Sequence, residues 1–425
     1  MVEPNQLTAI QAATRIRNGE LTSEALVRAC LARIEEREAA VAAWEYLNPA
    51  QAVAQARACD RMSERGALHG VPVGFKDICD TADMPTTYGS RAHLGHRPTI
   101  DATCVALTRT AGGVVLGKTV STEFAGRHAG KTANPHDPLR TPGGSSSGSA
   151  AAVADYMVPL ATATQTGGSV IRPAAYCGAF GYKATFGHLS FEGIRHGAET
   201  FDTLGCMARS VEDLALFRAV LMGVRPEPLQ APGAAPRIAF CRTFRWEEAD
   251  DATRRCLEAA AQRLRRAGAA VSDLALPKPF ADIYDLAWTI MHFEYARNVS
   301  PEWREQPDNV SSAMRKMIDA SAEIPLARYL AALERIDRLR AEIQEIASGY
   351  DAFLTPSAIG EAHVGLNDTG PVTFNVIWNA MGMPCITIPA FKGPNGMPIG
   401  AQFVAARHRD GALFDVAGWA AARLM

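Results

Sequence analysis

Apolar residues along this chain change their spacing near residue 70, and the change predicts where helices give way to strands. Before that point the spacing is helical: Cys30 and Ile34 share one face of a segment that Ser23 can cap. From 70 to about 205, short apolar runs typical of buried strands alternate with alanine-rich helical stretches. This alternation predicts an α/β fold with a largely buried sheet.

The pattern predicts further elements up to the end of the chain. Ser210 and Asp213 have the spacing of a capping box, which predicts a helix that begins there and ends before Gly223. We expect helices over 149–156 and 326–347, and strands over 71–75, 114–116, 158–162, 238–241, 352–354, 385–388 and 399–403.

A segment with four prolines, 224–236, predicts a surface connection within one large domain. The domain is expected to have four parts: N-terminal helices in 1–66, a catalytic core in 70–223, a mainly helical and more variable part in 237–350, and a return to the same sheet in 351–425. We expect the central sheet to be mixed and mostly parallel, with helices on both faces.

Composition and charge argue against several classes of protein. With 425 residues, 48% of them hydrophobic, the chain can bury a large core without disulfides. A formal net charge of −2 with interspersed signs argues against a nucleic-acid partner, and the lack of a leader-like start or long apolar run argues against a membrane. Nine scattered cysteines without a Cys-x-x-Cys pair favour reduced thiols in the cytoplasm. His93 and His96 have no third ligand close in sequence, so we expect neither a metal nor a cofactor.

Three motifs carry candidate chemistry: GVPVGFKD at 70–77, GGSSSGS at 143–149 and TQTGGSVIR at 164–172. They contain Lys76, Ser145 and Ser169. A serine hydroxyl is a weak nucleophile until a base removes its proton, and a buried lysine can be that base because burial disfavours its charged form. Taken singly, Ser169 also fits a solvated turn, and Lys76 also fits a salt bridge with the adjacent Asp77.

The middle motif resembles two other sites whose surroundings it lacks. Gly144 to Gly148 matches the G-x-S-x-G nucleophile elbow, but three prolines in 134–142 leave no strand before it. A phosphate-binding loop would end in Gly-Lys-Ser or Gly-Lys-Thr, which the segment does not. One functional interpretation remains: a Gly/Ser loop that begins a helix and presents hydroxyl groups toward Ser169. The alternative is an ordinary capped helix.

Together the three motifs resemble the amidase signature family of serine hydrolases. Family-like sequence also occurs at 201–209, 379–384 and 396–402. The resemblance implies a single domain with a mixed sheet between helices, and it implies that Ser169 is the nucleophile, Ser145 a bridging serine and Lys76 the base. It further implies a cis peptide bond between Gly144 and Ser145. The backbone N–H groups expected to form the oxyanion hole are those of Thr166, Gly167, Gly168 and Ser169.

Arg172 is a candidate substrate-binding residue. Two residues, Val170 and Ile171, separate Ser169 from Arg172, and this spacing resembles the bacterial malonamidase group. In that group the arginine is associated with the carboxylate of a short acidic amide, and a guanidinium suits carboxylate geometry. The alternative is that Arg172 pairs with an internal carboxylate and braces its loop. Aromatic candidates for the pocket are Tyr88, Trp288, His292, Tyr295 and Trp378.

The sequence therefore predicts an amidase that hydrolyses a small amide, with or without an acid group, to a carboxylate and ammonia or an amine through an acyl-enzyme on Ser169. One alternative is a hydrolase that cleaves a carbamate, urea-like or anilide bond with the same three residues. Another is the amidase subunit of a tRNA-dependent amidotransferase, for which the chain looks short. The number of chains in the assembly stays open, a homodimer included.

Overall fold

The computed structural model describes residues 2–425. Its strands are β1 (Trp44–Leu47), β2 (Pro72–Lys76), β3 (Val114–Thr119), β4 (Leu160–Gln165), β5 (Phe180–Lys183), β6 (Thr203–Ala208), β7 (Arg237–Cys241), β8 (Ala270–Leu274), β9 (Ala352–Pro356), β10 (Cys385–Lys392) and β11 (Pro398–Val404). The α-helices are α1 (Ala9–Asn18), α2 (Ser23–Val41), α3 (Pro49–Arg61), α4 (Thr103–Thr110), α5 (Ser147–Ala154), α6 (Ile171–Cys177), α7 (Val211–Leu221), α8 (Asp251–Arg266), α9 (Ile283–Glu305), α10 (Ser312–Ala322), α11 (Leu326–Ser348), α12 (Val376–Ala380) and α13 (Asp410–Leu424).

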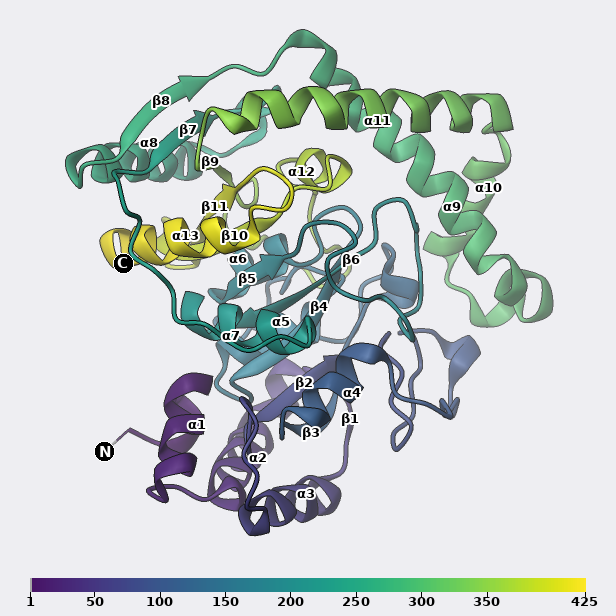
Figure 1. The fold of residues 1–425 in the computed structure, drawn as a ribbon. Coiled ribbons are helices and arrows are strands. Elements are labelled where there is room, and N and C mark those ends of the chain that lie inside the picture. Colours follow the sequence, from purple (N-terminus) through teal and green to yellow (C-terminus); the bar gives the residue numbers. More distant parts are fainter. Residues whose placement is uncertain (1) are drawn as a thin grey trace.

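All described strands join one sheet in the order β1-β3-β2-β4-β6-β5-β10-β11-β9-β7-β8. The tail returns to this sheet through β9, β10 and β11, as the sequence predicts (Figure 1). The α/β class and the mixed sheet flanked by helices are confirmed. The helices α5 and α6 pack together on the central strands, and α7 and α13 form a second packed pair on them.

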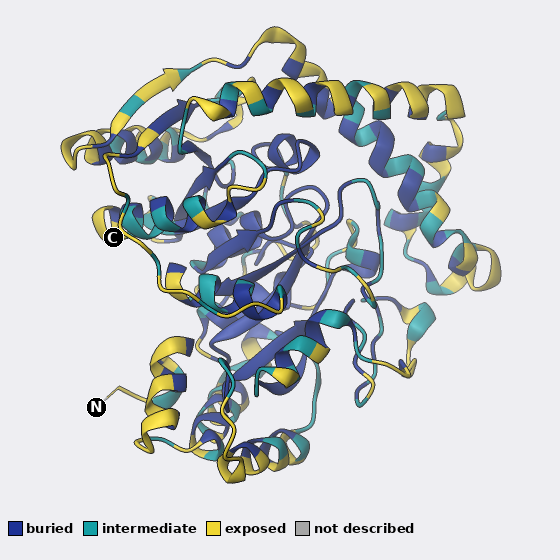
Figure 2. Cartoon of the chain, in the orientation of Figure 1, coloured by how far each residue is buried: buried dark blue, intermediate teal, exposed yellow. Residues whose placement is uncertain are grey.

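The expectation that the sheet is mostly parallel is wrong. Of the ten neighbouring strand pairs, six are antiparallel and four are parallel. The parallel pairs join β2 to its two neighbours and β7 to its two neighbours. Antiparallel strands usually alternate apolar and polar residues, but β4 and β6 are buried at every position. They therefore have the continuous burial pattern that is more typical of parallel strands (Figure 2).

The capping box predicted at Ser210 is only half formed. Ser210 Oγ accepts a hydrogen bond from Asp213 N, and α7 begins at the next residue after Ser210. The Asp213 carboxylate instead accepts from the N–H groups of Ala9 and Ile10, 2.8 and 3.0 Å away. Asp213 therefore caps the first turn of α1, a partner more than 200 residues distant that local spacing does not reveal.

Helices α9, α10 and α11 form an arm at one side of the molecule, where α9 packs against both of the others (Figure 1). Much of the outer face of α11 is exposed, whereas α9 has a long buried face (Figure 2). Residues 2–425 contain no helix long and apolar enough to cross a membrane. Within the same residues, no three His, Cys, Asp or Glu side chains gather as metal ligands would, and all nine cysteines are free.

Candidate active site

Lys76 and Ser145 are in direct contact below the surface. Lys76 is the last residue of β2 and has no exposed area. Its Nζ donates to Ser145 Oγ at 2.7 Å and to Thr164 Oγ1 at 2.8 Å. Thr162 and Thr164 are two residues apart in β4, so their side chains point to the same face of the sheet. Thr162 Oγ1 accepts a hydrogen bond from the Lys76 backbone N–H at 3.0 Å. The neighbouring strand thus fixes both ends of the lysine.

Burial lowers the pKa of Lys76 to about 7 because the charged ammonium loses its hydration. The salt bridge with Asp77 that the sequence allowed is absent. Asp77 lies 3.4 Å from Lys118 Nζ and also accepts from the Thr87 backbone N–H. Among residues 2–425, Lys76 forms no ion pair, so a large fraction of its amine is neutral near pH 7 and can accept a proton.

The loop before α5 presents Ser145 to the lysine. The peptide bond between Gly144 and Ser145 is cis, as the family resemblance implied. Ser145 O accepts from Thr122 N at 3.1 Å, and Ser146 lies within 3.3 Å of both backbone polar groups of Thr164. Gly148, in the first turn of α5, lies so close to the strand region that a Cβ would come within 2.2 Å of Ala43 O. A glycine is therefore required where the helix meets the backbone of Ala43 and Val120, next to β1 and β3.

Ser169 lies between β4 and α6 and lines a cavity of about 550 Å³. Its hydroxyl forms no hydrogen bond with any residue in 2–425, and the structure therefore does not connect it to Ser145. The backbone N–H groups of residues 166–169 have no protein partner within the same range. The next two N–H groups, those of Val170 and Ile171, donate to Gln165 Oε1. This bonding begins α6 and leaves the preceding four donors available to a ligand.

Two polar residues, Asp202 and Asn379, hold Thr166 in place. Thr166 Oγ1 donates to Asp202 Oδ1 at 2.6 Å, and Asn379 Nδ2 donates to the carbonyl of Thr166. Asp202 also accepts from His196 Nδ1 at 3.1 Å, which raises the pKa of His196. The hydroxyl and the carbonyl of Thr166 are thus held by residues that follow it in the sequence by 36 and 213 positions.

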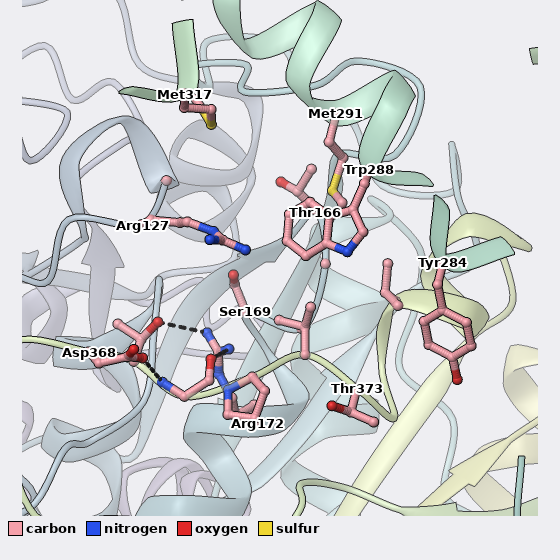
Figure 3. A pocket seen from close by; sticks show the side chains of 18 of the residues that line it. Arg127, Thr166, Ser169, Arg172, Tyr284, Trp288, Met291, Met317, Asp368 and Thr373 are labelled. Atoms are coloured by element: carbon pink, nitrogen blue, oxygen red, sulfur yellow. Dashed lines mark hydrogen bonds between the residues drawn. The ribbon is translucent and has the colours of Figure 1, made fainter. Parts of the chain in front are cut away.

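Arg172 lines the cavity, but most of its donors are used within the protein. Its guanidinium donates to the carbonyl oxygens of Gly144 and Gly370 and to Thr369 Oγ1. The bracing alternative supposed that Arg172 pairs with an internal carboxylate. Among the described residues, no carboxylate forms an ion pair with it. Burial lowers the pKa of Arg172 to about 10. The contacts tie the serine loop at Gly144 to the loop at 368–370 (Figure 3).

The cavity lies between the glycines of 166–169 and two helices of the arm, α9 and α10. Trp288, His292 and Tyr295 line it, whereas Tyr88 and Trp378 do not. Its charged lining consists of Arg127, Arg172, Arg245, Glu248, Asp285 and Asp368.

Sequence reasoning missed several residues of this site. Thr164 belongs to a quoted motif, and its position two residues after Thr162 in a strand could have placed it opposite Lys76. Asn379 also lies in a family-like block, although its contact with Thr166 crosses 213 residues. Asp202 likewise lies in the family-like block 201–209, whereas nothing in the local pattern marked Arg127.

Comparison with known proteins gives a consistent family assignment. The model of the family described as Amidase matches residues 25–414. A glutamyl-tRNA(Gln) amidotransferase subunit of Chloroflexus aggregans is 38% identical over 301 residues, which are 65% of this chain and 62% of that relative's own length. "Putative amidase AmiD" of Mycobacterium bovis is 31% identical over 438 residues, covering 94% of this chain and 90% of that protein.

Solved structures agree with these sequence matches. A crystal structure of a protein described as an amidase superposes with a TM-score of 0.90 at 28% identity. The superposition covers 99% of this chain and 100% of the other.

Proposed function

The chain belongs to the amidase family, and from this membership we propose that it hydrolyses a small amide through an acyl-enzyme on Ser169. The observation that carries the proposal is the buried contact of Lys76 Nζ with Ser145 Oγ, beside a cavity lined by Ser169. An amine without an ionic partner, held against a hydroxyl, is suited to accept a proton.

In the proposed first half-reaction, neutral Lys76 takes the proton of Ser145, and Ser145 takes the proton of Ser169. For this step the free Ser169 hydroxyl turns toward Ser145 as the substrate binds. Ser169 Oγ bonds to the amide carbon, and the carbonyl π electrons move onto its oxygen. The N–H groups of residues 166–169 stabilise that oxyanion, each donor being worth roughly 3 kcal/mol in comparable sites.

The intermediate then collapses by breaking the C–N bond. The proton held by Lys76 returns through Ser145 to the leaving nitrogen, which departs as ammonia or an amine. Water attacks the acyl-enzyme by the same route, giving a carboxylate and restoring Ser169. The positions of Lys76, Ser145 and Ser169 support these roles, and the contact between the two serines is part of the proposal.

For Arg172 we propose the bracing role. Its donors reach backbone carbonyls, one of them that of Gly144 immediately before Ser145. A substrate carboxylate would have to compete with these buried bonds. The resemblance to malonamidases at 169–172 therefore does not by itself assign an acidic substrate.

Two alternatives use the same residues. Cleavage of a carbamate, urea-like or anilide bond needs the same acyl transfer. The role of an amidotransferase subunit is favoured by the name of the Chloroflexus relative, whose match covers 65% of this chain, and by the same name of a Streptomyces coelicolor relative, 30% identical, whose match covers 97% of this chain. The Mycobacterium relative, which is named as an amidase, is matched over 94% of it.

The test is ammonia release by the isolated chain from simple amides, glutamine, a carbamate and an anilide. We expect turnover of a simple amide with little preference for glutamine, and its loss in Ser169→Ala. A matched control is Ser190→Ala, which changes an exposed serine outside the cavity. Activity on glutamine alone would favour the amidotransferase role, and full activity of Ser169→Ala would refute the mechanism.

A further inference from the structure

Three arginines line the cavity, and they differ in what occupies their donors. Arg172 is bound to backbone carbonyls and Thr369. Arg245 pairs with Glu248 at 2.9 Å and stacks 4.7 Å from the ring centre of Tyr284. Arg127 is exposed and forms no hydrogen bond or ion pair with any residue in the part of the chain that the structure describes. Its charge is therefore available to a ligand.

The loop that carries Arg127 is fixed on both sides of it. Glu123 N donates to His128 O at 3.2 Å, and Thr122 Oγ1 donates to Gly126 O at 2.9 Å. Tyr295 Oη, from α9, donates to Ala125 O at 3.1 Å. The backbone of this loop is thus held by bonds within the segment and by one from the arm, while the arginine head carries none.

Trp288 orients the side chain of Arg127. The guanidinium carbon lies 4.6 Å from the centre of the indole ring. A guanidinium over an aromatic face keeps the N–H groups along its edge free, and those groups match the two oxygens of a carboxylate. Figure 3 shows Arg127 reaching into the cavity toward the side where Ser169 lies.

The carboxylates of the cavity do not neutralise Arg127. Glu248 is paired with Arg245, and Asp368 accepts from Gly370 N within its own loop at 2.6 Å. Asp285 lies on α9 one turn before Trp288 and forms no ion pair with a described residue. Burial and the positive charge of Arg127 both lower the pKa of His292, another residue that lines the cavity.

We propose that Arg127 binds a carboxylate carried by the substrate and so makes the enzyme selective for amides that also bear an acid group. The inference rests on the proposed function and names the substrate class of that site. A cavity of about 550 Å³ leaves room beyond the amide for a short acid-bearing chain. Arg127 is here a specificity residue and takes no part in proton transfer.

The test compares matched substrates that differ in charge: succinamate with butyramide, and glutaramate with pentanamide. Replacing Arg127→Ala should raise KM about 10- to 100-fold for the better acidic amide, because a bidentate charged contact is lost. KM for the neutral partner should change less than about threefold. The control, Arg245→Ala combined with Glu248→Gln, removes a paired arginine from the same cavity without changing the net charge of the cavity and should not discriminate between the pair. Equal effects of Arg127→Ala on both substrates, or equal discrimination by both variants, would overturn the proposal.

A binding measurement separates this inference from the proposed function. Calorimetry on Ser169→Ala protein should detect succinate or glutarate, and adding Arg127→Ala should weaken that binding at least about tenfold. If wild-type protein hydrolyses no amide while this difference persists, the proposed function fails and the anion site stands. Dicarboxylates that do not bind, or that bind equally without Arg127, would overturn the site whatever the activity.

Discussion

The two sides of the cavity are built differently. On the sheet side, Lys76 and Ser145 are buried, and Lys76, Thr164 and Thr166 are each held by hydrogen bonds to neighbouring strands or loops. On the arm side, exposed Arg127 and Asp285 face the cavity and form no ion pair with a described residue. Under the proposed function, the sheet side supplies the reaction and the arm side selects the substrate. Changes on the sheet side should lower the rate for every substrate, whereas changes on the arm side should alter their ranking.

Replacing the base is expected to have the largest effect. Lys76→Met should lower kcat about 1000-fold for acidic and neutral amides alike, because a positioned base is removed. In wild-type protein, kcat/KM should fall as the pH drops through about 7, where Lys76 becomes protonated. Pre-steady-state and steady-state assays from pH 5 to 10 would check this. Lys76→Ala should not show this fall near pH 7, and it should recover part of its rate at high pH. A pH profile unchanged from wild type would show that another residue is the base.

The same lysine makes stability depend on pH. Its pKa is about 7 in the folded protein and 10.5 in an unfolded chain. Between these values the unfolded state binds a proton that the folded state does not, so wild-type stability should rise with pH across that window. The increase should be smaller in Lys76→Met, as measured by urea unfolding at pH 7 and pH 9.

Arg172 sharpens the comparison. It lines the cavity, as Arg127 does, but its guanidinium is held by hydrogen bonds within the protein, as the residues of the sheet side are. Arg172→Gln should destabilise the protein by about 2 to 4 kcal/mol, since it leaves buried carbonyls without donors. It should lower kcat for succinamate and butyramide by similar factors. Thermal melts and paired kinetics provide the measurements. A rise in KM confined to succinamate would make Arg172 the carboxylate anchor and would weaken the case for Arg127.

The smallest effect is expected far from the cavity. Asp213→Ala removes the acceptor for the first N–H groups of α1 and should cost about 1 to 2 kcal/mol of stability. Because no part of the cavity is formed by α1, kcat and KM should not change. Denaturant unfolding and routine kinetics suffice. Lost activity with normal stability would show that the N-terminal helices contribute to the site.

The sheet side was more predictable from sequence than the arm side. Strands near 71–75 and 158–162 followed from short apolar runs. The motifs also singled out Lys76 and Ser145, which the structure brings into contact, and Ser169, which lines the cavity. Direction of pairing was not predictable, because strands buried on both faces have the same pattern in either orientation. For the segment that contains α9 the sequence predicts only a mainly helical part over 237–350, and the contact of Trp288 on this helix with Arg127 depends on tertiary packing.

Covalent labelling tests the central claim most directly, because it identifies the nucleophile without assuming a substrate. The protein is treated with a fluorophosphonate at pH 8 and the adduct is mapped by mass spectrometry. The account predicts a single adduct on Ser169, with none on residues 145–147, formed far more slowly in Lys76→Met. An adduct on another residue, or an unchanged labelling rate in that variant, would contradict it.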